Sequence, residues 1–290
     1  MLSNFAPLTE HFYQPSHFSS AVIFVSQLYP SYLDCLFKQL EVSNCHDIAL
    51  VFENYFDSQL LRKNISTSGF ENIEIYINKN YLKDLDEIIQ IWESEPRINN
   101  IFIFNFSHDT IIVKDDLTGC SIIGVSQPFN VAQNYISNSE HYFQVTIDIY
   151  MEALRHNLFY NKKIFIDGEG TIYNDVNLTK EFGNITQIND LKALSENADF
   201  TWHWHIPKTE IDICKHCEFR YLCLDSRVPI KRESGGYYHE LECNYNPFIC
   251  KWKGENEYLT LKEVGVVSNS EEYTIDYEKL KTINNILWGS

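Results

Sequence analysis

Residues 30–53, PSYLDCLFKQLEVSNCHDIALVFE, combine the two patterns that decide the fold class. The first half has the spacing of one helix face, with apolar side chains at Leu33, Leu36, Phe37 and Leu40. The second half contains a continuous apolar run at 48–52, which has the length of a buried strand. A helix that leads directly into a buried strand is typical of a repeating βα unit.

The same alternation continues on both sides of this stretch. Apolar runs predict further strands at 21–25, 73–77 and 100–106, and amphipathic patterns predict helices at 56–63 and 81–93. The strand centres recur about every 25 residues, which suits parallel strands with helices outside. Four or five such units are too few for a closed eight-unit barrel. Residues 1–160 are therefore predicted to form an α/β domain, an open partial (β/α) barrel.

Beyond residue 106 the pattern loosens, with strand-like runs at 111–113, 121–125 and 142–147 and a helix near 148–158. Two apolar runs, 163–166 and 171–173, flank the turn Asp167-Gly168-Glu169-Gly170 and predict a β-hairpin. We place a domain boundary near residue 160. Residues 161–290 lack the periodicity of a large core and are predicted to be a cysteine-rich domain held by a metal. A closing helix carries Leu280, Ile283 and Leu287.

Composition and the N-terminal sequence limit the partners and the cellular compartment that we expect. The net charge of −17 argues against a nucleic-acid partner, because such proteins present basic surfaces. The N-terminus lacks a signal-peptide pattern, and no apolar run approaches the ~20 residues of a membrane helix. We therefore expect a cytoplasmic protein without a membrane partner. In that compartment its eight cysteines are reduced, and Cys35, Cys45 and Cys120 are predicted to be buried small hydrophobes.

The remaining thiols are grouped. Residues 214–227, CKHCEFRYLCLDSR, contain Cys214, Cys217 and Cys223 at C-x2-C-x5-C spacing, and Cys243 follows after nineteen intervening residues. Four thiolates that converge can bind a tetrahedral zinc ion or a 4Fe-4S cluster, and spacing does not distinguish the two. Cys250, seven residues after Cys243, is a possible substitute for it.

The other histidine and carboxylate groups that could bind metal or catalyse are interpreted as structural. His203 and His205 alternate with Trp202 and Trp204, which predicts a half-buried strand with no ligand role. Asp167, Glu169 and Asp175 suit turn chemistry. The sequence has no nucleotide-binding, hydrolase or zinc-protease motif, and no catalytic residue is assigned.

Residues 161–253 resemble a SPASM domain, the auxiliary-cluster domain of peptide-modifying radical SAM enzymes. The resemblance rests on KIFIDGEGTIYN, FGNI, ICKHCEFRYLCLDSRVPIKR and ECNYNPF, in that order. The segments CEFRYLC and YYHELECNYNP most resemble the grasp-with-spasm system SPASM domain peptide maturases. Residues 30–53 resemble the degenerate barrel of the same family. The resemblance implies a precursor peptide and an ATP-grasp ligase as partners. It also implies that longer relatives carry an N-terminal segment that this chain lacks.

Two departures from the family pattern limit the chemistry that the resemblance implies. A radical SAM enzyme carries a C-x3-C-x2-C loop, which is absent here, so no S-adenosylmethionine is expected. The full SPASM pattern has cysteines where this chain has Asp175 and Arg227, so one auxiliary cluster is expected to be lost. The resemblance implies that Cys214, Cys217, Cys223 and Cys243 hold the other cluster.

These observations favour an accessory component of ribosomal-peptide maturation that binds or presents the precursor and carries one 4Fe-4S cluster. One alternative is a zinc-stabilised protein- or peptide-binding module without a redox role. A second alternative is a peptide-modifying redox enzyme that depends on another protein for radicals.

Overall fold

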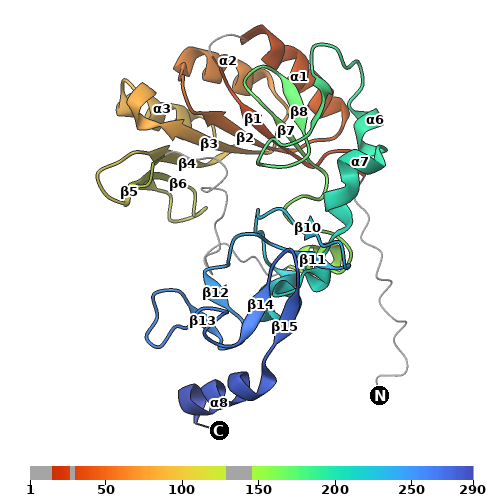
Figure 1. Cartoon of the computed structure of the whole chain (residues 1–290). Coiled ribbons are helices and arrows are strands. Elements are labelled where there is room, and N and C mark those ends of the chain that lie inside the picture. Colours follow the sequence, from red (N-terminus) through yellow and green to blue (C-terminus); the bar gives the residue numbers. More distant parts are fainter. Residues whose placement is uncertain (1–14, 27–29, 129–145, 290) are drawn as a thin grey trace, which may run out of the picture. The chain divides into compact units, whose positions relative to one another are not determined.

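The computed structural model describes residues 15–26, 30–128 and 146–289. These residues divide into two compact units (Figure 1). The sheet unit contains residues 15–26, 30–128 and 162–201, and the cysteine unit contains residues 146–161 and 202–289.

The sheet unit is built on one open sheet of nine strands, in the order β5-β6-β4-β3-β2-β1-β7-β8-β9. Its six central strands pair in parallel: β1 (Ser20–Phe24), β2 (Asp47–Phe52), β3 (Asn72–Asn78), β4 (Ile98–Phe104), β6 (Ser121–Val125) and β7 (Lys163–Ile166). Three antiparallel strands extend its edges: β5 (Thr110–Lys114), β8 (Thr171–Tyr173) and β9 (Glu181–Asn184). The predicted α/β class is confirmed, and the sheet is mixed.

Helices connect the first four strands. They are α1 (Pro30–Val42), α2 (Ser58–Thr67) and α3 (Leu85–Ser94), with a 3-10 turn, η1 (Lys79–Tyr81), before α3. Figure 1 shows all three on the same face of the sheet, as successive right-handed crossovers require. The α2 and α3 helices begin later than predicted because Asp57 and Asp84 accept hydrogen bonds from the first free N–H groups and so fix each start.

The core of the sheet unit is a set of in-register apolar rows. One row crosses six strands, and its side chains are 0–2% exposed: Ile166, Ile23, Leu50, Ile75, Ile101 and Ile122. Leu36 and Leu40 of α1 and Ile88 of α3 are also fully buried, at 0% exposure each. Helical and strand periodicities in the sequence therefore bury complementary faces.

The predicted β-hairpin is confirmed, because Phe165 pairs with Tyr173 and Ile166 with Ile172. However, β7 also pairs in parallel with β1, so the hairpin belongs to the sheet unit. The chain passes from one unit to the other near residue 161 and again near residue 201. Residues 162–201, including α6 (Lys192–Ser195) and α7 (Ala198–Thr201), are therefore not part of the cysteine unit. The domain boundary near residue 160 stays a prediction.

The cysteine unit consists of short elements. Its helical turns are α5 (Ile147–Ala153), η3 (Trp202–His205), η4 (Lys208–Glu210), η5 (Cys214–His216) and η6 (Glu218–Tyr221). Three antiparallel pairs follow: β10 (Ile230–Lys231) with β11 (Tyr237–Tyr238), β12 (Tyr245–Asn246) with β13 (Lys251–Trp252), and β14 (Val266–Ser268) with β15 (Tyr273–Ile275). The α8 helix (Tyr277–Trp288) closes the unit.

The predicted stripe of α8 is confirmed, since Leu280, Ile283 and Leu287 pack against a cluster that contains Val264. The run predicted at 142–147 lies largely outside the described residues, and Ile147 begins α5, which ends before the predicted residue 158.

Three predictions about side chains are wrong: those for segment 202–205, for Cys35 and for Cys120, which is only partly buried. Cys45 is buried, as predicted. Trp202–His205 is a 3-10 turn, so neighbours rather than alternate residues share a face: His203 and Trp204 are buried, and Trp202 and His205 are exposed. Cys35 is exposed on α1, because it lies beside the buried stripe of that helix rather than in it.

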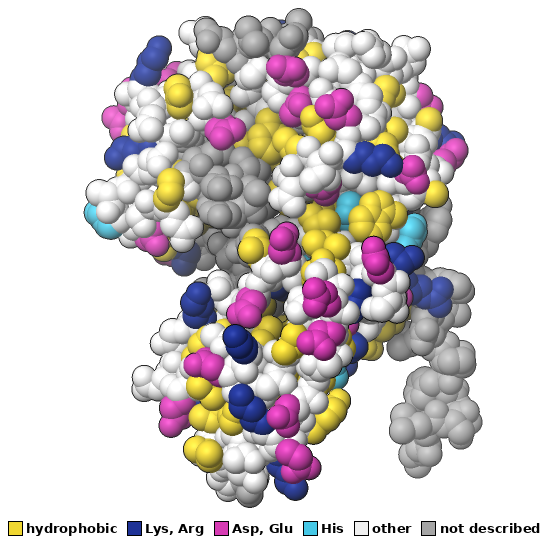
Figure 2. Space-filling view, in the orientation of Figure 1, with side chains coloured by type: hydrophobic (Ala, Val, Ile, Leu, Met, Phe, Trp, Pro, Cys, Tyr) yellow, Lys and Arg dark blue, Asp and Glu magenta, His cyan; other side chains and the backbone are white. Residues whose placement is uncertain are grey.

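None of the described helices combines the length and the apolar character that a membrane-spanning segment requires. On the face shown in Figure 2, Lys and Arg side chains lie among Asp and Glu side chains and do not form a continuous basic surface.

Candidate metal centre

The cysteine knuckle is a tight turn. Cys214 begins η5, and the N–H of Cys217 donates to the carbonyl of Cys214 at 3.0 Å. The guanidinium of Arg220 donates to the carbonyl of Cys217 at 2.8 Å. The chain segment that carries the two C-x2-C thiols is therefore a closed, hydrogen-bonded turn.

Backbone amides are directed at three of the four sulfurs. The sulfur of Cys217 accepts the N–H of Phe219, and that of Cys223 accepts the N–H of Asp225. The sulfur of Cys243 accepts the N–H of Tyr245 at 3.4 Å. In each case the donor lies two residues after the cysteine. Such hydrogen bonds favour the thiolate, which is the form that binds metals.

Electrostatic interactions link the four thiols through Cys214, which interacts with Cys217, Cys223 and Cys243. Among the described residues, no three of these sulfurs lie within 4.8 Å of one another. A tetrahedral zinc shell with Zn–S bonds of ~2.3 Å needs sulfurs about 3.8 Å apart. A cubane cluster holds its cysteines farther apart, since each binds a different iron.

Cys250 has a different neighbourhood. It is exposed and lies beside the hydroxyl of Tyr245, which bonds to the carboxylate of Glu218. Its sulfur is 3.9 Å from the carbonyl oxygen of Pro247. Its substitution for Cys243 as a ligand remains a prediction.

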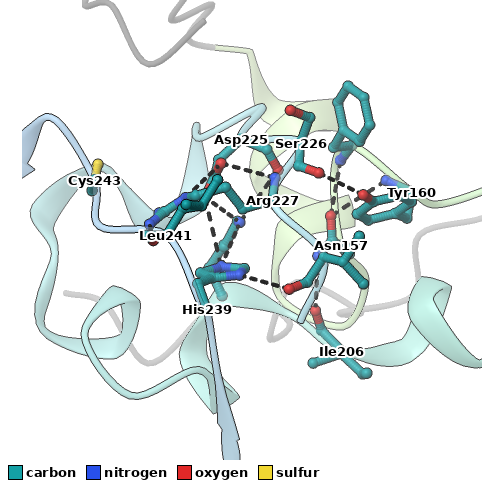
Figure 3. A network of polar contacts seen from close by, with 12 residues as sticks. Asn157, Tyr160, Ile206, Asp225, Ser226, Arg227, His239, Leu241 and Cys243 are labelled. Atoms are coloured by element: carbon teal, nitrogen blue, oxygen red, sulfur yellow. Dashed lines mark hydrogen bonds and ion pairs between the residues drawn. The ribbon is translucent and has the colours of Figure 1, made fainter. Parts of the chain in front are cut away.

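A buried network of charges surrounds Asp225, which is 0% exposed (Figure 3). The Nε of Arg227 donates to both carboxylate oxygens at 3.0 and 2.9 Å, and its Nη2 donates to Oδ2 at 2.7 Å. The Nζ of Lys208 donates to Oδ2 at 2.9 Å. Asp225 is thus one carboxylate shared by two buried cations.

His239 completes this network as a neutral side chain. Its Nδ1 lies 3.1 Å from the carbonyl oxygen of Val228, which can only accept a hydrogen bond, so Nδ1 carries the proton. Its Nε2 can then accept from Lys208 Nζ, which is 3.3 Å away. Burial lowers the pKa of His239 well below its usual value, and the nearby Arg227 and Lys208 cations lower it further.

The same network connects to the cysteines. Ligand atoms of Cys214, Asp225 and His239 lie within 4.8 Å of one another. Lys208 interacts electrostatically with Cys214 and Cys223, and Arg227 interacts with Cys214 and Cys243. A separate metal ion on Cys214, Asp225 and His239 is disfavoured, because the Asp225 oxygens already bind two cations, which would repel the ion.

The pKa values describe the metal-free state. Burial raises the pKa of Cys214 and of Cys217, and it raises the pKa of Cys223 to about 12. Burial alone would also raise the pKa of Asp225, but Arg227 and Lys208 hold it well below its usual value. At neutral pH these three cysteines are therefore protonated thiols beside a charged network, and metal binding must displace protons.

Charge balance in the cysteine unit is unusual for such an acidic protein. Its buried charged residues are three cations (Lys208, Arg227 and Arg232) and two carboxylates (Asp212 and Asp225). Arg232 pairs with Asp212 at 2.6 Å, so the excess positive charge belongs to the network around Asp225. A buried charge that lacks a counter-charge costs several kcal/mol. Metal-bound thiolates would supply the missing negative charge.

A pocket of about 370 Å³ adjoins this region of the cysteine unit. Cys214 and Cys243 line it together with Arg227 and His239, and Ile211, Ile213 and Val266 supply apolar walls. Cys217 and Cys223 are not among its lining residues.

The two positions where the SPASM pattern has further cysteines have other partners here. Arg227 binds Asp225, as described above. In the sheet unit Asp175 is buried and accepts hydrogen bonds from the N–H of Asn177 at 2.8 Å and from the hydroxyl of Thr179 at 2.5 Å. Both side chains therefore have local structural roles.

Sequence reasoning missed Lys208, Asp225 and His239 as members of this site. Asp225 lies between Cys223 and Arg227 in the quoted stretch, so its position next to a ligand and an arginine was a usable signal. Lys208 lies six residues before Cys214 and His239 four residues before Cys243, but no spacing pattern marks either of them.

Comparisons with known proteins add little to this geometry. No family model matches the chain, and no curated protein does. Among solved structures, BtrN in complex with AdoMet and 2-DOIA has a TM-score of 0.40 and 12% identity, covering 64% of this chain and 85% of BtrN. An open conformation of BtrN has a TM-score of 0.36 and 14% identity, covering 69% and 92%. Likeness at these scores carries no inference about fold or function.

Proposed function

We propose that this chain is an iron–sulfur protein in which Cys214, Cys217, Cys223 and Cys243 hold one 4Fe-4S cluster. The observation that carries the proposal is the gathering of the four thiols beside two buried cations: Cys214 interacts electrostatically with each of the other three, and Lys208 and Arg227 are buried next to them. Backbone N–H groups two residues later also donate to three of the sulfurs, as suits cluster thiolates, although the sheet-unit thiol of Cys45 accepts one from Asp47 as well.

The charge balance supports the same assignment. A 4Fe-4S cluster with four thiolates, or a zinc ion with four, leaves about two net negative charges at the site. Lys208 and Arg227 share one carboxylate, so together they supply part of the counter-charge. The spacing of the sulfurs favours the cluster over the single ion.

The biological setting of this site comes from the resemblance of residues 161–253 to SPASM domains. A bound cluster would supply one-electron chemistry or structural support. With no C-x3-C-x2-C loop in the sequence, the chain acts as an accessory protein that binds or presents a precursor peptide to an ATP-grasp ligase in the cytoplasm. The sheet unit, an open partial barrel in this proposal, is the scaffold.

Anaerobic purification tests the cluster. The protein should be brown, with about four iron atoms per chain and a broad absorption band near ~400 nm. Cys217→Ser should abolish the band, while Cys120→Ser, a matched control in the sheet unit, should retain it. A colourless protein with one zinc per chain would overturn the cluster and favour the zinc-stabilised binding module.

Co-purification tests the partners. The tagged protein, co-expressed with a ligase and a precursor peptide of the resembled system, should recover at least one of them. Recovery of neither would contradict the accessory role while leaving the metal assignment intact.

A further inference from the structure

The network around Asp225 is held rigidly against the cysteines. The backbone N–H of Asp225 donates to the sulfur of Cys223, and its carboxylate binds Lys208 and Arg227. The Nη1 of Arg227 also donates to the carbonyl of Leu241 at 2.6 Å, two residues before Cys243. Hydrogen bonds therefore connect the network to the chain segments that carry Cys223 and Cys243.

The network has a net charge of +1, because Lys208 and Arg227 are cations, Asp225 is an anion and His239 is neutral. Lys208 is 2% exposed and the Arg227 side chain is 7% exposed. Water and salt therefore screen these charges poorly, and their influence on a group bound by the cysteines is much larger than that of surface lysines.

We infer that Lys208 and Arg227 are positioning residues that raise the reduction potential of the group bound by the four cysteines. The inference rests on the proposed function. Reduction adds one negative charge at the site, and a fixed positive charge nearby lowers the free energy of the reduced form more than that of the oxidised form. The buried network thus favours a centre that accepts an electron over one that only supports the fold.

The redox step is a single electron transfer. A one-electron donor of the ferredoxin class loses one electron and is oxidised, and the cysteine-bound group gains it and is reduced. No covalent bond forms or breaks, and no proton moves. Lys208 and Arg227 stay charged throughout, so their contribution is an electrostatic field that does not change during the step.

Potentiometric titration of the intact cluster-loaded protein tests this inference. Lys208→Met leaves Asp225 bonded to Arg227, so the variant should fold with a neutral network. At a fixed solution potential the ratio of reduced to oxidised cluster should fall about tenfold. This corresponds to a reduction potential lower by about 59 mV for a one-electron couple. Lys253→Met, which removes an exposed lysine of the same unit, should change the ratio less than twofold.

A second variant shifts the potential in the opposite direction. Asp225→Asn raises the network charge to +2 and should raise the potential, whereas a merely structural disturbance would shift both variants the same way. Equal potentials for Lys208→Met and the parent protein would overturn the inference with the cluster still present. If Asp225→Asn does not load a cluster, the difference in reduction potential between Lys208→Met and Lys253→Met still tests the inference. Failure of the parent protein to assemble any cluster would instead refute the proposed function.

Discussion

The two units are stabilised by different kinds of buried group. The sheet unit buries rows of aliphatic side chains, such as Ile23, Ile75 and Ile101, which need no partner other than one another. The cysteine unit buries Lys208, Asp225 and Arg227 beside thiols, in a region of two- and three-residue strands. An aliphatic core is stable in any ionic state, whereas a charged core depends on every partner being in place. Metal loss should therefore leave the stability of the first unit unchanged and lower that of the second.

Loss of the metal ligands should have the largest effect. Cys214→Ser removes the thiol that interacts with the other three, so the variant should lose the proposed cluster, and residues 202–289 should be less protected from hydrogen exchange than in the parent protein. The sheet unit should keep its protection. Hydrogen-exchange mass spectrometry reports both units in one measurement, and equal protection of both in the variant would contradict a metal-dependent unit.

Asp225→Asn in the metal-free protein should lower the free energy of unfolding of the cysteine unit by about 3–5 kcal/mol, because Lys208 and Arg227 are left buried without a counter-charge. Urea denaturation followed by Trp fluorescence measures the loss. Asp199→Asn is the control, since its exposed pair with Lys180 should be worth less than about 1 kcal/mol. A loss that is no smaller in the cluster-loaded protein would argue against charge compensation by thiolates.

Ile75→Ala tests the aliphatic core. Ile75 is fully buried in the central row of the sheet, so the substitution should destabilise the sheet unit by about 2–5 kcal/mol. Iron content per folded chain should not change, because the cysteines belong to the other unit. Loss of cluster in this variant would show that the two units are not independent.

His203 gives the cysteine unit an acid sensitivity. Its ring packs on Tyr160 and Trp202, neither ring nitrogen bonds to a described residue, and burial lowers its pKa from 6.5 to about 3. Between these values the unfolded chain binds a proton that the folded chain does not, so stability falls as pH falls through this window. Between pH 7 and pH 5 the parent protein should therefore lose about 2 kcal/mol of unfolding free energy that His203→Phe keeps. Unfolding curves at the two pH values check this, and an equal acid loss in both proteins would contradict it.

The smallest effect concerns a helix end in the sheet unit. The carboxylate of Asp57 accepts the N–H groups of Gln59 and Leu60 at 2.9 and 3.0 Å. Asp57→Ala should cost about 1 kcal/mol of the sheet unit's stability. Glu71→Ala, at an exposed loop position, serves as the control in the same thermal melt. No difference between these two variants would show that the cap does not limit stability.

Local sequence patterns predicted much of the sheet unit. The alternation of a helix stripe such as Leu33, Leu36 and Leu40 with continuous apolar runs gave the parallel strands and their helices. The hairpin around Asp167 and the stripe of α8 were also predicted. Helix starts were less accurate, because backbone N–H groups that donate to the carboxylates of Asp57 and Asp84 fix them.

By itself the sequence determined the strand and helix periods and the grouping of Cys214, Cys217, Cys223 and Cys243 along the chain, since these depend on spacing within a few turns. Only the tertiary structure placed β7 beside β1, buried His203 and assembled Lys208, Asp225 and His239. Those arrangements join segments separated by up to about 140 residues in the chain. Their stability comes from the sum of packing, desolvation and charge pairing at the assembled site, which no local pattern encodes.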